Sequence, residues 1–225
     1  MSFPLPGNYI DIHNHGSIPE NGKFQLESLM THENREPENI GTLAFSIGVH
    51  PWFLTPDNLE QQIAIVAKYS TNQNIVAIGE AGFDRLKGPS LKIQENAFAE
   101  HVMIAEKVSK PLFIHCVRAW DDLLAVHKRL LPSTPWIIHG FRGKKELARQ
   151  LTDKGMFLSL WYDFILRPES SSLVRSLPKD RIFLETDGSG VDIRTIYNKV
   201  AADLEITADD LKNRIHNNYK EVFRK

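Results

Sequence analysis

The chain of 225 residues is poor in cysteine, in net charge and in long hydrophobic runs. Its single cysteine, Cys116, excludes an intramolecular disulfide and suits a reducing compartment. No apolar stretch approaches the roughly 20 residues of a membrane helix, and the N-terminus lacks a basic segment followed by an apolar one. The sequence therefore predicts neither a membrane span nor a secretory signal, and we expect a cytoplasmic protein.

The chain also lacks an excess of charge of one sign. Its 27 Lys and Arg residues balance 28 Asp and Glu residues, which leaves a net charge of −1 and excludes a general polyanion binder. A nucleic acid would have to be held by a metal site and by a local basic patch, for which Arg142, Lys144 and Lys145 are candidates. An ordinary solvated helix start explains these three residues about as well.

The composition predicts one domain over residues 1–225. A hydrophobic content of 42% is enough for a sizeable core, and no linker, repeat or low-complexity segment interrupts the chain. No feature of the sequence requires an obligate protein partner.

Short apolar runs recur along the chain and predict strands that are buried on both faces, as in a parallel sheet. There are eight such runs, at residues 9–13, 24–30, 43–49, 74–79, 111–114, 135–138, 156–160 and 181–186. Most of the intervening segments have apolar residues at helical spacing, at 56–69, 90–108, 119–131 and 144–154. Thr207 and Asp210 open a last helix with a capping-box pattern.

This alternation predicts an α/β fold of the TIM-type (β/α) barrel class. The length is near the short end for that fold, and a strand must fit between His15 and Leu43. We therefore expect a compact barrel in which the helices after the first two strands are missing or reduced to single turns. The alternative is an open doubly wound sheet, which the even spacing of the candidate site residues disfavours.

Ionisable side chains follow five of the predicted strands. His13 and His15 are two residues apart and point to one face where the first strand gives way to a loop. Later strands end in Glu80, His115, His139 and Asp187, and in such a barrel this end of the strands carries the active site. The candidate metal ligands are thus His13, His15, Glu80, His115, His139 and Asp187.

The types of these ligands indicate the chemistry. Imidazoles and carboxylates suit Zn or Mn better than Mg, and six ligands fit two divalent metal ions with Glu80 as the bridge. Two ions would clamp the attacking and leaving oxygens of a phosphoryl displacement. Asp187 is the best candidate to take a proton from the attacking water and to pass it to the leaving group, so we predict Asp187 and Glu80 as catalytic residues.

Several motifs together resemble the TatD family of metal-dependent deoxyribonucleases. They run in order from about residue 9 to residue 223, and comprise Asp11-Ile12-His13-Asn14-His15, Gly48-Val49-His50-Pro51, Ile78-Gly79-Glu80-Ala81-Gly82-Phe83-Asp84, Ile114-His115-Cys116, His139-Gly140-Phe141-Arg142-Gly143, Leu184-Glu185-Thr186-Asp187 and Asn218 to Phe223. The resemblance implies a barrel of the amidohydrolase superfamily, phosphodiester hydrolysis with Mg in the usual description, and DNA as substrate. It also matches the six ligands one by one.

The sequence departs from the family pattern beside the ligands. Val117 stands where the family often has Arg, and Arg118 follows it as a possible substitute. Trp52 replaces a common second His, and Gly188-Ser189-Gly190 forms a more flexible rim. His50 is either a phosphate donor or a structural loop residue. Trp52, Trp120 and Trp161 follow strand ends, where they either stack a base or plug the barrel mouth.

We therefore predict a metal-dependent hydrolase of the TatD type, which cleaves the phosphodiester bonds of DNA through a two-metal site. His50, Arg118, Arg142, Lys144 and Lys145 are the expected substrate-binding residues. The main alternative is an amidohydrolase-like esterase or amidase that acts on a small molecule, because the same site can polarise a carbonyl. A non-catalytic metal-binding protein is a third class.

Overall fold

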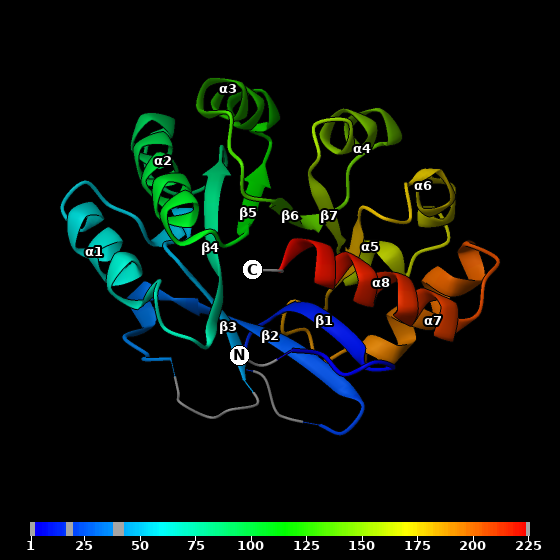
Figure 1. Cartoon of the computed structure of the whole chain (residues 1–225). Helices are drawn as coiled ribbons and strands as arrows, with labels where there is room; N and C mark the ends of the chain where they lie inside the picture. The colour runs from blue at the N-terminus through cyan, green and yellow to red at the C-terminus, as the bar shows by residue number, and fades with distance from the viewer. Residues whose placement is uncertain (1–2, 17–19, 38–42, 224–225) are drawn as a thin grey trace. The chain divides into compact units, whose positions relative to one another are not determined.

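The computed structural model describes residues 3–16, 20–37 and 43–223. Eight strands are hydrogen-bonded to one another in sequence order, and the pairs β1–β2, β3–β4, β4–β5 and β7–β8 are parallel. This strand order confirms the TIM-type barrel class (Figure 1). The strands are β1 (Tyr9–Asn14), β2 (Lys23–Met30), β3 (Ala44–Gly48), β4 (Ile75–Asp84), β5 (Leu112–Val117), β6 (Trp136–Phe141), β7 (Phe157–Leu160) and β8 (Ile182–Leu184).

Helices follow the strands from β3 onward. They are α1 (Leu59–Tyr69), α2 (Leu91–Val108), α3 (Trp120–Leu130), α4 (Lys145–Thr152), α5 (Tyr162–Ile165), α6 (Ser170–Ser176), α7 (Ile193–Asp203) and α8 (Ala208–Val222). In the described part of the chain, no α-helix follows β1, and only the 3₁₀ turn η1 (Thr31–Glu33) follows β2. The expected loss of the first two helices is confirmed. The helices α5, α6 and α7 were not predicted from the sequence.

Strand β4 extends further than its apolar run. The sequence predicts that the strand stops before Glu80, but β4 continues to Asp84, so Glu80 lies within it. Gly82 explains the extension, because a Cβ at this position (φ +150°) would lie 2.0 Å from the carbonyl oxygen of His115. The absence of a side chain keeps β4 hydrogen-bonded to β5 beyond Glu80. The strands that carry His115 and His139 also continue for two residues past them.

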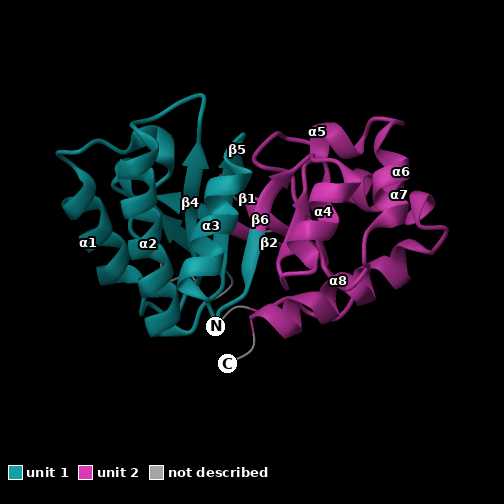
Figure 2. Cartoon of the chain, turned by 90° about the horizontal axis from the view of Figure 1, so that it is seen from above, with its two compact units in different colours: residues 1, 28–137, 225 teal, residues 2–27, 138–224 magenta. Residues whose placement is uncertain are grey.

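The chain divides into two compact units (Figure 2), unit 1 with residues 28–137 and unit 2 with residues 2–27 and 138–224. In unit 1, helices α1 and α2 pack together and α2 covers β4. Its core includes a run of edge-to-face rings, with Phe98 5.1 Å from Phe83 and 5.2 Å from Trp136 between ring centroids. This packing holds the strands that carry Glu80 and His115.

In unit 2, helices α7 and α8 hold the strands β1 and β8. The buried hydroxyl of Tyr197 on α7 accepts a hydrogen bond from the Ile10 N–H and donates one to the Ile10 carbonyl, and so completes the backbone pairing of β1. Asn218 on α8 donates to the carbonyl of Ile182 in β8. The predicted capping box of Thr207 and Asp210 is confirmed. No helix in the described residues is long and apolar enough to span a membrane.

Candidate metal centre

In unit 2, the predicted ligands His13 at the end of β1 and His15 just after it meet Asp187 in the turn after β8. The carboxylate Oδ1 of Asp187 lies 3.4 Å from Nε2 of His15 and 3.8 Å from Nε2 of His13. One ligand atom from each of the three side chains lies within 4.8 Å of the others, which is a group that can hold a metal ion. His13 is buried, whereas 37% of the His15 side chain and 28% of the Asp187 side chain are exposed.

The carboxylate of Asp11 fixes the positions of these ligands. It accepts hydrogen bonds from the Thr186 N–H (3.0 Å), the Thr186 hydroxyl (2.6 Å) and the Asn14 amide (3.2 Å). Asn14 in turn accepts from the N–H of His15. Asp11 therefore holds β1 against the turn that presents Asp187. Burial raises the pKa of Asp11 to about 7, although the hydrogen bonds from Thr186 lower it.

His139 lies in unit 2 as well, beside His13 and Glu185. Its ring centroid is 4.3 Å from that of His13. Nδ1 of His139 lies 3.1 Å from Oε1 of the fully buried Glu185, and the same oxygen accepts from the Gly140 N–H at 2.7 Å. A carboxylate can only accept, so Nδ1 of His139 carries the proton and donates to Glu185. Nε2 of His139 then carries a lone pair and can act as a metal ligand.

In unit 1, Glu80 and His115 meet the imidazole of His50, which was predicted only as a substrate-binding residue. Oε1 of Glu80 lies 2.8 Å from Nδ1 of His115 and 3.3 Å from Nε2 of His50. The two imidazole nitrogens are 3.2 Å apart. All three side chains are buried, and they form a second group that can hold a metal ion.

The hydrogen bonds around His115 test whether a cation fits between these atoms. Nε2 of His115 lies 3.1 Å from the Asp84 carboxylate, so this nitrogen donates and Nδ1 turns its lone pair toward Glu80. Two acceptor atoms, Nδ1 and Oε1 of Glu80, then face each other at 2.8 Å. Two facing lone pairs repel, and either the Nε2–H of His50, 3.2 Å and 3.3 Å from the two atoms, or a metal ion bound to both atoms relieves this repulsion. The donor set therefore fits a metal ion.

Asp84 anchors this group in unit 1. Besides His115, its carboxylate accepts from the indole N–H of Trp52 at 2.6 Å and from the N–H groups of Leu86 and Lys87. Burial alone would raise the pKa of Asp84, but the hydrogen bonds from Trp52, Leu86 and His115 outweigh it and hold the pKa below its usual range. The bonds to Leu86 and Lys87 fix the loop that follows β4.

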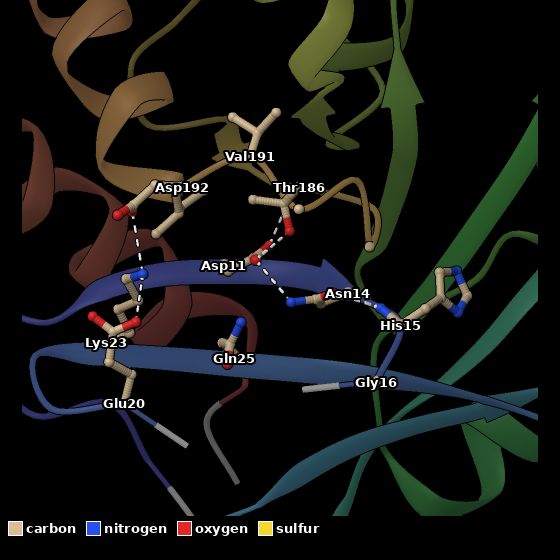
Figure 3. A pocket seen from close by; sticks show the side chains of 13 residues that line it. Asp11, Asn14, His15, Gly16, Glu20, Lys23, Gln25, Thr186, Val191 and Asp192 are labelled. Atoms are coloured by element: carbon tan, nitrogen blue, oxygen red, sulfur yellow. Dashed lines mark hydrogen bonds and ion pairs between the residues drawn. The ribbon is translucent and has the colours of Figure 1, made fainter. Parts of the chain in front are cut away.

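A cavity of about 360 Å³ runs along β1 in unit 2 (Figure 3). His15 lies at one end, and Lys23 lies at the other, where its ammonium is paired with Glu20 and Asp192. The wall also contains the carboxylate of Asp11. The wall thus has three carboxylates and one ammonium, which makes this cavity unfavourable for an anion but suitable for neutral polar groups.

The predicted phosphate-binding residues take separate positions. In unit 2, the guanidinium of Arg142 lies 3.7 Å from the ring centroid of Trp161. Lys144 occupies the N-cap position of α4 without a side-chain hydrogen bond to the helix, and Lys145 begins that helix. In unit 1, the exposed Arg118 directly follows β5 in a left-handed backbone conformation (φ +53°). Stacking on Trp161 uses the face of the Arg142 guanidinium and restricts the side chain. The N–H groups at the edge of the guanidinium can still donate hydrogen bonds.

Sequence reasoning gave no site role to three buried carboxylates, Asp11, Asp84 and Glu185. Asp11 and Asp84 belong to the motifs quoted above, but neither one follows a strand as a ligand would. A usable signal existed for Asp11, because it is two residues before His13 and shares its side of β1. The contacts of Asp84 and Glu185 depend on tertiary structure, since their histidine partners are 31 and 46 residues away in sequence.

Comparison with known proteins connects this geometry to one family. The family model described as TatD-related DNase matches residues 27–224. A deoxyribonuclease Tat-D of Schizosaccharomyces pombe is 29% identical over 69% of this chain and 54% of its own length. A 3'-5' ssDNA/RNA exonuclease TatD of Cronobacter turicensis is 33% identical over 69% of this chain and 60% of its own length. The aligned part of the chain thus spans little more than half of these relatives.

Solved structures have the same fold. A TatD homologue from Escherichia coli superposes with a TM-score of 0.79 and 21% identity, over 98% of this chain and all of that one. A TatD-family hydrolase from Entamoeba histolytica gives a TM-score of 0.77 and 15% identity, over 98% of this chain and 99% of that one. At these identities the likeness concerns the fold.

Proposed function

The chain belongs to the TatD family, and from this premise we propose that it is a metal-dependent phosphodiesterase that cleaves DNA. The observation that carries the proposal is the pair of ligand groups, His13–His15–Asp187 in unit 2 and His50–Glu80–His115 in unit 1. Imidazole and carboxylate together are the ligands of hydrolytic metal sites. The named relatives, a deoxyribonuclease and a single-stranded DNA and RNA exonuclease, support the substrate class.

The proposed site takes two divalent metal ions, Zn, Mn or Mg. His13, His15, Glu80, His115, His139 and Asp187 would hold them. When bound, the ions neutralise the phosphate and favour attack by water at neutral pH. His50 joins this set as a neighbour of Glu80. Its Nδ1 accepts from the backbone N–H of Trp52, so its Nε2 carries the proton, and His50 would donate to a phosphate oxygen and not bind a metal ion in this tautomer.

Asp187 is the proposed general base. Its carboxylate is partly exposed and can take a proton from the attacking water and return it to the leaving oxygen. Its backbone N–H is held by the carbonyl of His13 at 3.1 Å, and Thr186 before it is held by Asp11. The backbone bond of Asp187 and the bonds of Thr186 therefore both fix the position of the carboxylate. A proton acceptor needs such a fixed position.

The proposed phosphate contacts outside the metal centre are Arg118, Arg142, Lys144 and Lys145. A chain with a net charge of −1 has no general attraction for DNA, so local cations must supply it. The cavity along β1 is not a phosphate site in this scheme, because carboxylates outnumber ammonium groups there. It offers room for the neutral sugar or base beside His15.

The deciding experiment is a substrate panel on the purified protein loaded in turn with Zn, Mn and Mg. Single-stranded DNA, RNA, a chromogenic phosphodiester and simple carboxylic esters and amides are compared, with Asp187→Asn as the control for contaminating nucleases. Metal-dependent cleavage of DNA that the variant lacks supports the proposal. Hydrolysis of esters or amides without any DNA cleavage would replace it by the amidohydrolase alternative.

A further inference from the structure

Trp52 is a large aromatic side chain at the edge of the ligand group in unit 1. It lies in the 3₁₀ turn η2 (Pro51–Phe53) after β3, and 40% of the residue is exposed. Its ring centroid is 4.8 Å from that of His50 and 5.8 Å from that of His115. The exposed part of the indole therefore lies beside candidate metal ligands, where a bound molecule can contact it.

The indole is held rigidly in this position. Its N–H donates to the Asp84 carboxylate at 2.6 Å, and the other contact of that oxygen is His115, at 3.1 Å. One buried carboxylate therefore fixes both the indole and a candidate metal ligand. A ligand on Trp52 would be placed at a defined distance from the reacting centre.

A cation lies on this indole. The ammonium of Lys87 is 3.9 Å from the ring centroid of Trp52, and the backbone N–H of Lys87 donates to the Asp84 carboxylate. Across the ranges 3–16, 20–37 and 43–223, no carboxylate lies within ion-pair distance of this exposed ammonium. By contrast, Lys23, Lys92, Lys199 and Lys212 each have a carboxylate partner. A weak cation–π contact is easily exchanged for a phosphate.

We propose that Trp52 and Lys87 form a nucleotide subsite, in which a base of single-stranded nucleic acid stacks on the indole and the ammonium pairs with the adjacent phosphate. The ligand class follows from the pair, because a flat π face beside a free-moving cation fits an aromatic group that carries an anion. The inference rests on the proposed function and adds the recognition element that a nearly neutral chain needs.

The test compares two non-cleavable oligonucleotides linked by phosphorothioates, one with bases and one abasic. The metal-loaded wild type should bind the base-containing strand about 5- to 150-fold more tightly, the range expected for one stacked base. Trp52→Ala should bind both strands equally. Trp52→Phe keeps the aromatic face but loses the bond to Asp84, and should retain part of the preference.

Lys87→Gln tests the cation separately. It should weaken the binding of both strands and reduce the slope of log affinity against log salt by roughly 0.7, the value for one single-strand phosphate contact. Lys92→Gln is the matched control, because Lys92 is an exposed lysine of α2 beside Glu95 and lies outside the subsite. Its salt slope should equal that of the wild type.

The outcomes separate this inference from the proposed function. If the wild type cleaves DNA but Trp52→Phe and Trp52→Ala keep its full preference for bases, the subsite is wrong and the nuclease remains. If Lys87→Gln and Lys92→Gln have the same salt slope, the phosphate contact is wrong. If the wild type cleaves no DNA and binds neither strand, both proposals are wrong. Thermal melting checks that each variant is folded. If Trp52→Ala does not fold, the salt slope of Lys87→Gln tests the subsite in its place.

Discussion

The two units hold their candidate ligands in opposite ways. In unit 1, the side chains of Glu80 and His115 are 3% and 9% exposed, and the buried carboxylate of Asp84 fixes the ring of His115. In unit 2, the side chains of Asp187 and His15 are 28% and 37% exposed, and Asp11 holds the backbone around them. A buried ligand is fixed before an ion arrives, whereas an exposed carboxylate can exchange protons with water. We therefore propose that unit 1 retains the metal and that unit 2 transfers the proton.

The backbone at Glu80 in unit 1 is also more regular than the backbone at Asp187 in unit 2. Glycines let β4 lie close against β5, so that Glu80 is held inside a regular strand. Asp187 follows the short strand β8 in a left-handed conformation (φ +52°), which an aspartate tolerates better than most residues. Unit 1 therefore presents Glu80 and His115 from strands, as unit 2 presents His13 and His139, whereas the proposed proton acceptor Asp187 lies in a turn.

The largest effect should come from removing that proton acceptor. Asp187→Asn should lower the turnover of a phosphodiester by about 10²–10⁴-fold, because an amide oxygen cannot take a proton from water. The protein should still bind at least one metal ion, since the ligands of unit 1 are untouched. Asparagine also tolerates the left-handed conformation, so the turn should persist.

Turnover at saturating metal and calorimetric metal titration check this prediction. Asp209→Asn is the matched control, because Asp209 is an exposed carboxylate near the start of α8, paired with Lys212. Its turnover should be unchanged. Near-wild-type turnover of Asp187→Asn would remove the functional difference between the units.

The second effect concerns the stability of unit 1 in acid. His101 on α2 is fully buried and accepts a hydrogen bond from the Val49 N–H, just before His50. Burial lowers the pKa of His101 to about 4. The unfolded chain binds a proton at this residue below about pH 6.5, whereas the folded chain does not until about pH 4, so acidification through this range favours unfolding.

His101→Gln should remove this source of acid sensitivity, because glutamine can accept the same bond and does not titrate. On acidification from pH 7 to pH 4, the wild type should lose on the order of 3 kcal/mol more of its unfolding free energy than the variant. Urea unfolding at several pH values gives the measurement. Parallel stability curves for the two proteins would show that His101 does not titrate in this way.

The third effect tests the buried anchor of unit 1. Asp84→Asn should lower the metal affinity by about 10- to 100-fold, the usual cost of losing a carboxylate behind a histidine ligand. The same change at Asp11 in unit 2 should lower turnover more than metal affinity, because Asp11 holds the turn of Asp187. Competition with a chromogenic chelator measures the affinity. Equal losses of affinity in the two variants would contradict the assignment of metal retention to unit 1.

Much of the fold follows from local sequence. Apolar runs set the eight strands, and the capping pattern of Thr207 and Asp210 sets the start of α8. The end of β4 was misplaced because its extension depends on contacts between Gly82 and a strand that lies further along the chain. Helix α7 was missed although Ile196 and Val200 are buried at helical spacing.

The site was predictable where one rule of spacing applies. His13 and His15 lie at the end of β1, and Asp187 follows β8 after two residues, so their meeting in unit 2 agrees with the sequence. The contact of Asp84 with His115 and Trp52 was not predictable, because it requires the pairing of β4 with β5 and the path of the turn after β3. The roles of all six ligands remain predictions.

The smallest effect concerns the cations outside the metal centre. Replacing Arg118, Arg142, Lys144 and Lys145 together by Gln should weaken the binding of single-stranded DNA and flatten its salt dependence. Each lost phosphate contact should lower the slope of log affinity against log salt by roughly 0.7. The metal ligands and Asp187 stay in place, so the activity of the variant on a small chromogenic phosphodiester should fall far less than its affinity for DNA. Fluorescence anisotropy at several salt concentrations measures the slope. An unchanged slope together with unchanged DNA cleavage would remove these four residues from the substrate path and leave Lys87 as the candidate phosphate contact outside the metal centre.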